Sequence, residues 1–147
     1  MTSKNNALIE QMIEKINRIK MYHRSEDAKQ QGGRGTGFVL TYLYYHGNQA
    51  LPSELGQKMN VSTPRVTAIL NELEARGLIT RSISPEDRRN INVMLSDKGR
   101  QVVEERLSKQ RKSIQLLVER LDEADVKAFL RVLDVLDSLM EERGCGI

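Results

Sequence analysis

The sequence predicts a mainly α-helical fold that carries one small β-hairpin, and two features of the chain support this prediction. Apolar residues recur every three or four positions over most of the 147 residues, which is the spacing of helices that bury one face. Between residues 79 and 95 the spacing changes to two, and a polar, turn-forming segment at 85–90 interrupts it. We therefore expect helices on both sides of a single hairpin.

The first expected helix covers residues 6 to about 22, because its apolar residues form one stripe. A glycine-rich segment at 30–37 follows and reads as a linker. It lacks the Gly-Lys-Ser/Thr ending of a phosphate-binding loop, so we expect no phosphate binding there. Residues 38–46 predict a second helix that stops at Gly47.

Two short helices joined by a tight turn are expected next. Pro52 suits the first position of the earlier helix, Asn60 can adopt the left-handed conformation that ends it, and Ser62 can cap the later helix. Gly56 lies where the two helices would cross closely, and Gly77 ends the second one. This is a helix-turn-helix pattern, and the hairpin directly after it makes the pattern a winged helix-turn-helix.

The end of the chain predicts a long helix at residues 97–120 and a last helix at 122–142. The apolar stripes of the first and last helices are longer than a small winged domain needs, so we expect them to be dimerisation helices of a homodimer, through residues of about 6–22 and 121–142. The predicted domains are 1–35 (N-terminal dimerisation helix and linker), 36–99 (winged helix-turn-helix) and 100–147 (connecting helix and C-terminal dimerisation helix).

Basic residues exceed acidic ones in the part of the chain that holds the hairpin. Residues 60–118 contain eleven Lys or Arg and seven Asp or Glu, whereas residues 119–147 contain four and eight. A local basic excess is typical of proteins that bind a polyanion. It is modest here, with a net charge of +3 for the whole chain.

Composition excludes several other classes of protein. No apolar run approaches the roughly 18 residues of a membrane helix, and the N-terminus does not read as a signal peptide. The single cysteine fits a reducing compartment, so we expect a cytoplasmic protein. No spacing assembles a nucleophile with a base, and one cysteine with His23 and His46 cannot supply a usual zinc site. We therefore expect neither an enzyme nor a bound metal or cofactor.

The candidate DNA contacts lie at the hairpin tip and on the second helix of the helix-turn-helix. Asp87 can hold Arg89 by a charge-assisted bond, and a fixed, projecting arginine suits the narrow minor groove of DNA. Polar residues opposite the apolar stripe of the helix are of types that reach phosphates and base edges. The hairpin tip alone, or the polar helix face alone, could equally be a solvated surface. The predicted DNA-binding residues are Ser62, Thr63, Arg65, Thr67, Asn71, Asp87, Arg88 and Arg89.

Three segments of the chain have a distinctive sequence: Leu-Glu-Ala-Arg-Gly-Leu-Ile at 73–79, Ser-Pro-Glu-Asp-Arg-Arg at 84–89 and Val-Met-Leu-Ser-Asp-Lys-Gly at 93–99. Through these segments, and over nearly its whole length, the sequence resembles the MarR family of transcriptional regulators. The resemblance implies a dimer whose two winged domains bind a pseudo-palindromic double-stranded DNA operator. The recognition helix, here 62–76, would enter the major groove and Arg89 the minor groove. Gly56 and Ser96 replace residues that are more often Ala and Thr, without threatening the fold.

The resemblance further implies a repressor that a small aromatic or anionic ligand releases from DNA. Family members bind such ligands between the dimerisation region and the winged domain, and Arg18 could pair with an anionic group. Phe38, Tyr42 and Tyr45 lie at i, i+4 and i+7 on one face of the second helix, and ordinary core packing also explains such an aromatic stripe. The candidate ligand residues are Arg18, Tyr22, His23, Tyr42 and Tyr45.

Two alternative functions remain open from the sequence. The first is a winged-helix module that binds protein, against which the arginine tip and the polar recognition face argue. The second is a regulator that responds to oxidation of Cys145 rather than to a ligand. Cys145 lies near the end of the chain, away from any evident base that would activate its thiol.

Overall fold

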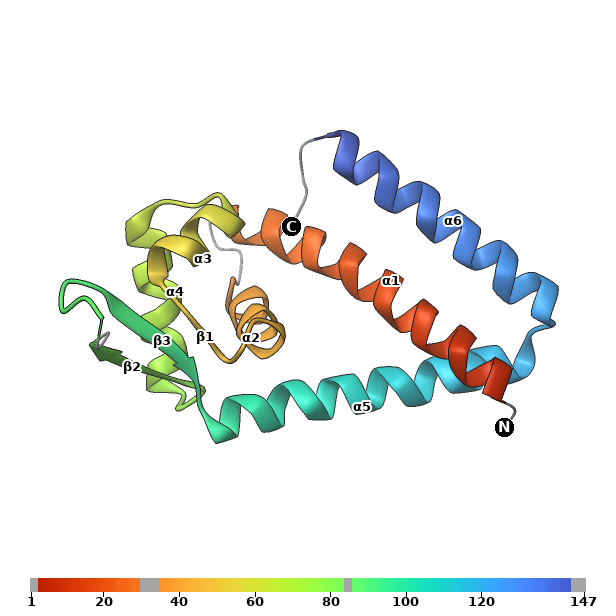
Figure 1. Cartoon of the computed structure of the whole chain (residues 1–147), viewed down its shortest axis with the longest axis horizontal. Coiled ribbons are helices and arrows are strands. Elements are labelled where there is room, and N and C mark those ends of the chain that lie inside the picture. The colour runs from red at the N-terminus through yellow and green to blue at the C-terminus, as the bar shows by residue number, and fades with distance from the viewer. Residues whose placement is uncertain (1–2, 30–34, 84–85, 144–147) are drawn as a thin grey trace. The chain divides into compact units, whose positions relative to one another are not determined.

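The computed structural model describes residues 3–29, 35–83 and 86–143 (Figure 1). Its elements confirm the predicted class, a mainly helical winged helix-turn-helix with additional N- and C-terminal helices. The chain divides into two compact units, Arg24–Glu105 and the pair of segments Met1–His23 with Arg106–Ile147, which are described in turn. The elements are α1 (Ser3–Lys29), α2 (Thr36–Tyr45), β1 (Gln49–Ala50), α3 (Pro52–Met59), α4 (Thr63–Ala75), β2 (Ile79–Ile83), β3 (Ile91–Leu95), α5 (Asp97–Arg120) and α6 (Glu123–Glu142).

The helix-turn-helix follows the local chemistry that the sequence predicts. Pro52 is the first residue of α3, and Asn60 ends that helix with a φ of 53°, in the left-handed region. The Ser62 hydroxyl oxygen accepts a hydrogen bond from the backbone N–H of Arg65 at 3.4 Å, so Ser62 caps α4 as expected. One face of α4 is buried and anchors it in the unit; it consists of Val66, Ile69, Leu70 and Leu73.

The wing belongs to a three-stranded antiparallel sheet with the order β1-β3-β2. Ile79 pairs with Leu95 and Ile83 with Ile91, which is the register of the predicted hairpin. The apolar face of the hairpin is buried only at the end away from the tip, because Ile79 is 1% exposed whereas Ile83 is 66% exposed. The strand β1 was not predicted, since two residues are too short to show an alternating pattern. It is held in place by the backbone N–H of Leu95, which donates to the carbonyl oxygen of Asn48 at 2.9 Å.

The first turn of α5 lies directly against the end of α4 and the start of β2. The Ser96 backbone N–H donates to the Leu78 carbonyl oxygen at 3.1 Å, and the Ser96 hydroxyl donates to the Gly77 carbonyl oxygen at 2.7 Å. The same hydroxyl oxygen accepts from the N–H of Gly99 at 3.0 Å. A Cβ atom at Gly99 would lie only 2.1 Å from the Leu78 carbonyl oxygen, so this junction has no room for a side chain.

We expect Gly99→Ala to lower the free energy of unfolding by about 3 kcal/mol, because a backbone atom must move to admit the methyl group. Urea denaturation followed by circular dichroism measures this change. Gly56→Ala is the matched control, since its Cβ would meet a side-chain methyl of Val66 at 3.2 Å, which can shift by a few tenths of an ångström. Equal unfolding midpoints for the two variants would contradict the crowded junction.

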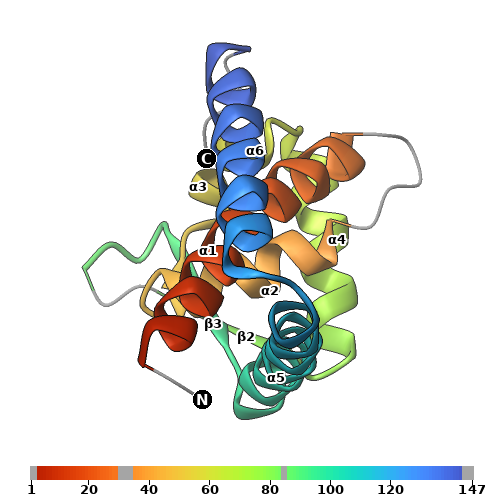
Figure 2. The same cartoon turned by 90° about the vertical axis from the view of Figure 1, so that its right-hand side faces the viewer.

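The second unit is built from α1, α5 and α6. α1 runs beside α6, as both views show (Figures 1 and 2). α1 is longer than the predicted helix, and its apolar stripe is covered by α5 and α6 of the same chain rather than left over. The core that results contains Leu8, Ile9, Met12, Ile114, Val118, Val126, Leu130 and Leu133, with Ile13, Ile16, Ile19 and Leu121 packed against it.

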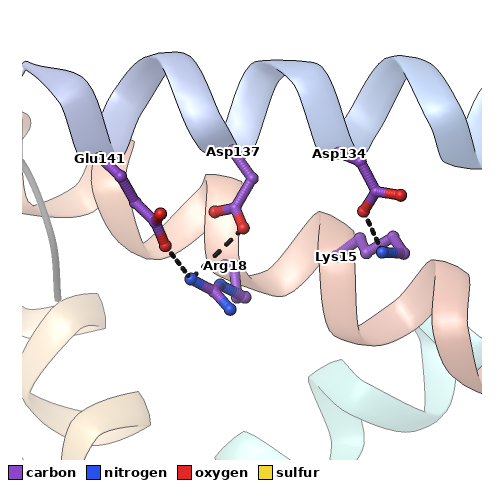
Figure 3. A network of polar contacts seen from close by, with 5 residues as sticks. All are labelled: Lys15, Arg18, Asp134, Asp137 and Glu141. Carbon is purple, nitrogen blue, oxygen red and sulfur yellow. Dashed lines mark hydrogen bonds and ion pairs between the residues drawn. The ribbon is translucent and has the colours of Figure 1, made fainter.

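Ion pairs tie the polar edges of the same helices together (Figure 3). Lys15 pairs with Asp134, and one Arg18 nitrogen, Nη2, lies 2.9 Å from Glu141 Oε1 and 3.3 Å from Asp137 Oδ2. These groups are partly exposed, so each pair contributes little alone. The paired carboxylates lie on the side of α6 that faces α1, so the opposite side of α6 points away from α1.

Candidate nucleic-acid interface

The outward face of α4 carries the polar residues predicted to contact DNA. Thr63, Thr67 and Asn71 are exposed and follow one another at intervals of four residues, so they share one side of the helix. The Thr67 hydroxyl donates to the Thr63 carbonyl oxygen at 3.0 Å, which leaves its oxygen as an acceptor. Arg65 is half-buried at the first turn of α4, which Ser62 caps, and the helical repeat places it on another side of the helix from this row.

The tip of the wing is organised by Asp87. One carboxylate oxygen, Oδ1, accepts from the backbone N–H of Arg89 at 3.0 Å, and the Asp87 carbonyl oxygen accepts from the N–H of Asn90 at 2.9 Å. The same Oδ1 lies 3.9 Å from Arg89 Nε, beyond hydrogen-bonding distance. Asp87 therefore shapes the turn through the backbone of Arg89, rather than through the guanidinium bond that the sequence suggested.

Arg88 and Arg89 both lie exposed at this tip, and the Arg89 side chain is 95% exposed. An arginine that is almost fully solvated keeps all its donors for a partner outside the chain. Ser84 and Pro85, which begin the predicted wing motif, lie outside the described residues. The described part of the tip thus presents two cations on a short, ordered turn.

A groove of about 620 Å³ separates the wing from the helix-turn-helix and brings the two predicted halves of the site together. Thr63 and Thr67 line it from α4, and Arg89 lines it from the wing. Arg89 lies more than twenty positions after the two threonines in the sequence, so the fold brings them to one groove. Its remaining walls come from the helix-turn-helix and the wing: Leu51, Pro52, Ser53, Gly56, Gln57, Asn60, Val61, Val66, Asn90 and Ile91.

Arg81, in the middle of β2, was not predicted as part of the site. Its guanidinium donates to both carboxylate oxygens of Glu74, at 3.0 and 3.1 Å, and to the side-chain oxygen of Asn71 at 2.6 Å. The hydrogen bond with Arg81 lowers the pKa of Glu74, and the same bond raises the pKa of Arg81. A charged residue on the otherwise apolar face of the hairpin was the sequence signal that could have revealed it.

The predicted ligand residues lie in different surroundings. Tyr42 is buried, stacks on His46 with ring centres 3.9 Å apart, and donates its hydroxyl to Glu54 at 2.9 Å. Burial, and then the bond to Glu54, raise the pKa of Tyr42 to about 12. Tyr45 is 53% exposed. Arg18 is engaged by the two carboxylates of α6 described above. Tyr22 and His23 belong to α1, but their side chains lie outside the described residues, as does Cys145.

The described residues contain no group of three or more His, Cys, Asp or Glu side chains that could hold a metal ion. No helix in the described ranges is long and apolar enough to cross a membrane.

Comparisons with known proteins agree with this architecture. The MarR family profile matches residues 35–91. The HTH-type transcriptional regulator YwhA of Bacillus subtilis is 33% identical over 97 residues, which cover 66% of this chain and 69% of that protein. The transcriptional repressor MprA of Escherichia coli is 34% identical over 90 residues, or 60% of this chain and 51% of MprA. The chain thus spans between about half and two thirds of the lengths of these relatives.

A solved structure extends the likeness to the whole fold. The crystal structure of FabT from Streptococcus pneumoniae, in complex with DNA, superposes with a TM-score of 0.64 and covers 94% of this chain and 90% of FabT. At 22% sequence identity, this match concerns the fold alone. It includes the N- and C-terminal helices as well as the winged domain.

Proposed function

Because the chain belongs to the MarR family of winged helix-turn-helix transcriptional regulators, we propose that it is a cytoplasmic homodimeric repressor of a pseudo-palindromic DNA operator, released by a small aromatic or anionic ligand. The chain is a transcriptional regulator and not an enzyme. That MprA is a repressor supports this direction of control.

The observation that carries the proposal is the pair of elements on either side of the groove. An exposed polar row on α4 has the dimensions to enter a major groove, and an exposed arginine on a short turn suits the adjacent minor groove. Thr63, Thr67 and Arg89 then act on one DNA duplex from two elements. A module that binds protein would gain little from this arrangement.

The second copy of the chain is proposed to cover a face of α6 that points away from α1. We call this the outer α6 face; its apolar residues are each between 39% and 60% exposed, and they are Phe129, Val132, Val135, Leu136 and Leu139. Leu116 and Leu117 of α5 are also exposed. Contiguous exposed apolar residues of this kind mark a protein interface, and a two-fold dimer supplies the symmetry that a palindromic site needs.

Footprinting on the DNA upstream of the chain's own gene tests the function most directly. We expect protection of two half-sites about one helical turn apart, with an affinity that falls as salt concentration rises. Binding that is equally weak for every duplex, or that does not respond to salt, would instead favour the protein-binding alternative. Chemical crosslinking in the same samples reports whether the bound species contains two chains.

Release of the operator by a ligand can be measured on the same protein–DNA complex. A ligand can act only by preferring a dimer geometry that DNA does not, and a preference of about 1–3 kcal/mol would weaken binding five- to 150-fold. We expect titration with salicylate-like aromatic acids to release the operator, and Tyr45→Ala to reduce that release. Tyr42→Phe tests the second candidate residue, because it removes the bond to Glu54 but preserves the buried ring.

The outcome of that titration also separates the two triggers. Release that is unchanged in both tyrosine variants would place the ligand site elsewhere. If no aromatic acid releases the DNA but peroxide does, and Cys145→Ser abolishes the peroxide effect, the oxidation alternative is correct.

A further inference from the structure

We propose that Arg81 is a positioning residue that presents the side chain of Asn71 to DNA as a hydrogen-bond donor, and so helps to set the base preference of the recognition helix. This inference rests on the proposed DNA-binding function. It assigns a role to a residue of the wing that faces the recognition helix rather than the tip.

The geometry places Arg81 between the two elements that read DNA. It lies opposite Val93 in the hairpin register, and its side chain is 23% exposed. Its Nε and Nη2 atoms bind the two oxygens of Glu74, which fixes the plane of the guanidinium as a two-pronged contact. From that fixed position, Nη2 also reaches the Asn71 side-chain oxygen at 2.6 Å.

The chemistry of the guanidinium then determines which way the amide of Asn71 points. A guanidinium carries only donors, so the Asn71 atom that faces it must be the oxygen. The amide nitrogen consequently points to the other side, and Asn71 lies on the exposed row of α4 that includes Thr63 and Thr67. Asn71 therefore offers N–H donors to DNA, while Arg81 binds one of the two lone pairs of the amide oxygen and keeps that oxygen directed toward β2.

An asparagine held in this way has a restricted choice of bases. Its donors can bind the acceptors of guanine, the O4 atom of thymine or the N7 atom of adenine. The two-bond recognition of adenine also needs the amide oxygen to face the base, which its bond to Arg81 opposes, and the amino group of cytosine offers only a donor. We therefore expect guanine or thymine to be preferred at the position that Asn71 contacts.

The ion pair with Glu74 prevents Arg81 from binding a DNA phosphate directly. The carboxylate neutralises the guanidinium at two contacts, and the lowered pKa of Glu74 keeps that carboxyl ionised around neutral pH. A cation that is already neutralised adds little to the counterion release that drives binding to phosphates. A positioning role and a phosphate contact therefore predict different salt dependence.

The experiment compares the wild type with Arg81→Met and Asn71→Ala on a pool of randomised duplexes and on a scrambled duplex. We expect Arg81→Met to relax the base preference at the same position in each half-site that Asn71→Ala relaxes, by about fivefold to tenfold. The double variant should relax it no further than Asn71→Ala alone. In Arg81→Met, the affinity for the scrambled duplex and the slope of log affinity against log salt concentration should stay at their wild-type values.

Arg100→Met is the matched control, because Arg100 belongs to α5, outside the recognition helix and the wing, and forms a long ion pair with Glu104, at 3.8 Å. Its base preference should equal that of the wild type. Arg81→Lys is a second test in case Arg81→Met does not fold; lysine keeps the charge but lacks the rigid planar fork, and should relax the same position.

Two results would overturn the inference. The first is a uniform loss of affinity for all duplexes with a salt slope smaller by about one, which would make Arg81 a phosphate contact. The second is an unchanged base preference in folded Arg81 variants. A wild-type protein that binds no duplex would instead show that the proposed function itself has failed.

Discussion

Replacing Val132 and Leu136 with aspartate is expected to convert the protein from a dimer to a monomer. Both side chains lie on the outer α6 face, where they are 55% and 44% exposed, so the charges should not disturb the core of the chain itself. Four buried, unpaired carboxylates would oppose association of two copies. Sedimentation at micromolar concentration should change from about twice the 16.8 kDa chain mass to the single mass.

The same variant should lose more than about a hundredfold in operator affinity, because one winged domain can hold only one half-site. Ser138→Asp is the control, since the helical repeat places this exposed residue of α6 away from the outer face. A doubly substituted protein that remains dimeric would show that another surface joins the two copies. A wild-type monomer would remove the basis for reading a palindrome.

The second large effect is expected for Arg89→Ala, which should weaken operator binding by about tenfold to a hundredfold without altering the fold. The Arg89 side chain is 95% exposed and touches little of its own chain, so its loss should act on DNA rather than on stability. Fluorescence anisotropy at a fixed salt concentration measures the change. Arg88→Ala controls for the loss of one exposed charge at the same tip.

Variants of Asp87 test how the tip is organised. Asp87→Asn keeps an oxygen that can accept from the Arg89 backbone N–H, whereas Asp87→Ala removes it. We therefore expect Asp87→Ala to weaken binding, less than Arg89→Ala does, and Asp87→Asn to remain close to the wild type. Loss of affinity in Asp87→Asn equal to that in Asp87→Ala would mean that the carboxylate acts through its charge on the guanidinium.

Local chemistry explains which parts of the fold the sequence could predict. Pro52, Asn60 and Ser62 mark helix ends through their own backbone preferences, and the alternation from Ile79 to Leu95 defines the hairpin register within one short segment. These signals involve residues close together in the chain. The short strand β1 gave no such signal, because it exists only through its pairing with β3.

Long-range packing explains what the sequence could not predict. The stripe on α1 was interpreted as a dimer surface, but helical periodicity does not say which helix covers it, and α5 and α6 of the same chain do. The bonds from Arg81 to Asn71 and Glu74 likewise join a strand to a helix, and only the folded chain brings them together. The predicted DNA and ligand residues stay predictions for the experiments above.

The exposed apolar residues at the strand ends beside the wing tip have a consequence for the free protein in concentrated solution. β2 is an edge strand only five residues long, and its exposed Ile83 lies opposite the exposed Ile91. Edge strands with exposed apolar side chains invite pairing with other chains, and nearby charges oppose it. Arg88 and Arg89 are such charges, so variants that lack both are expected to aggregate at high concentration before their affinity for DNA can be measured, and they are better compared when dilute.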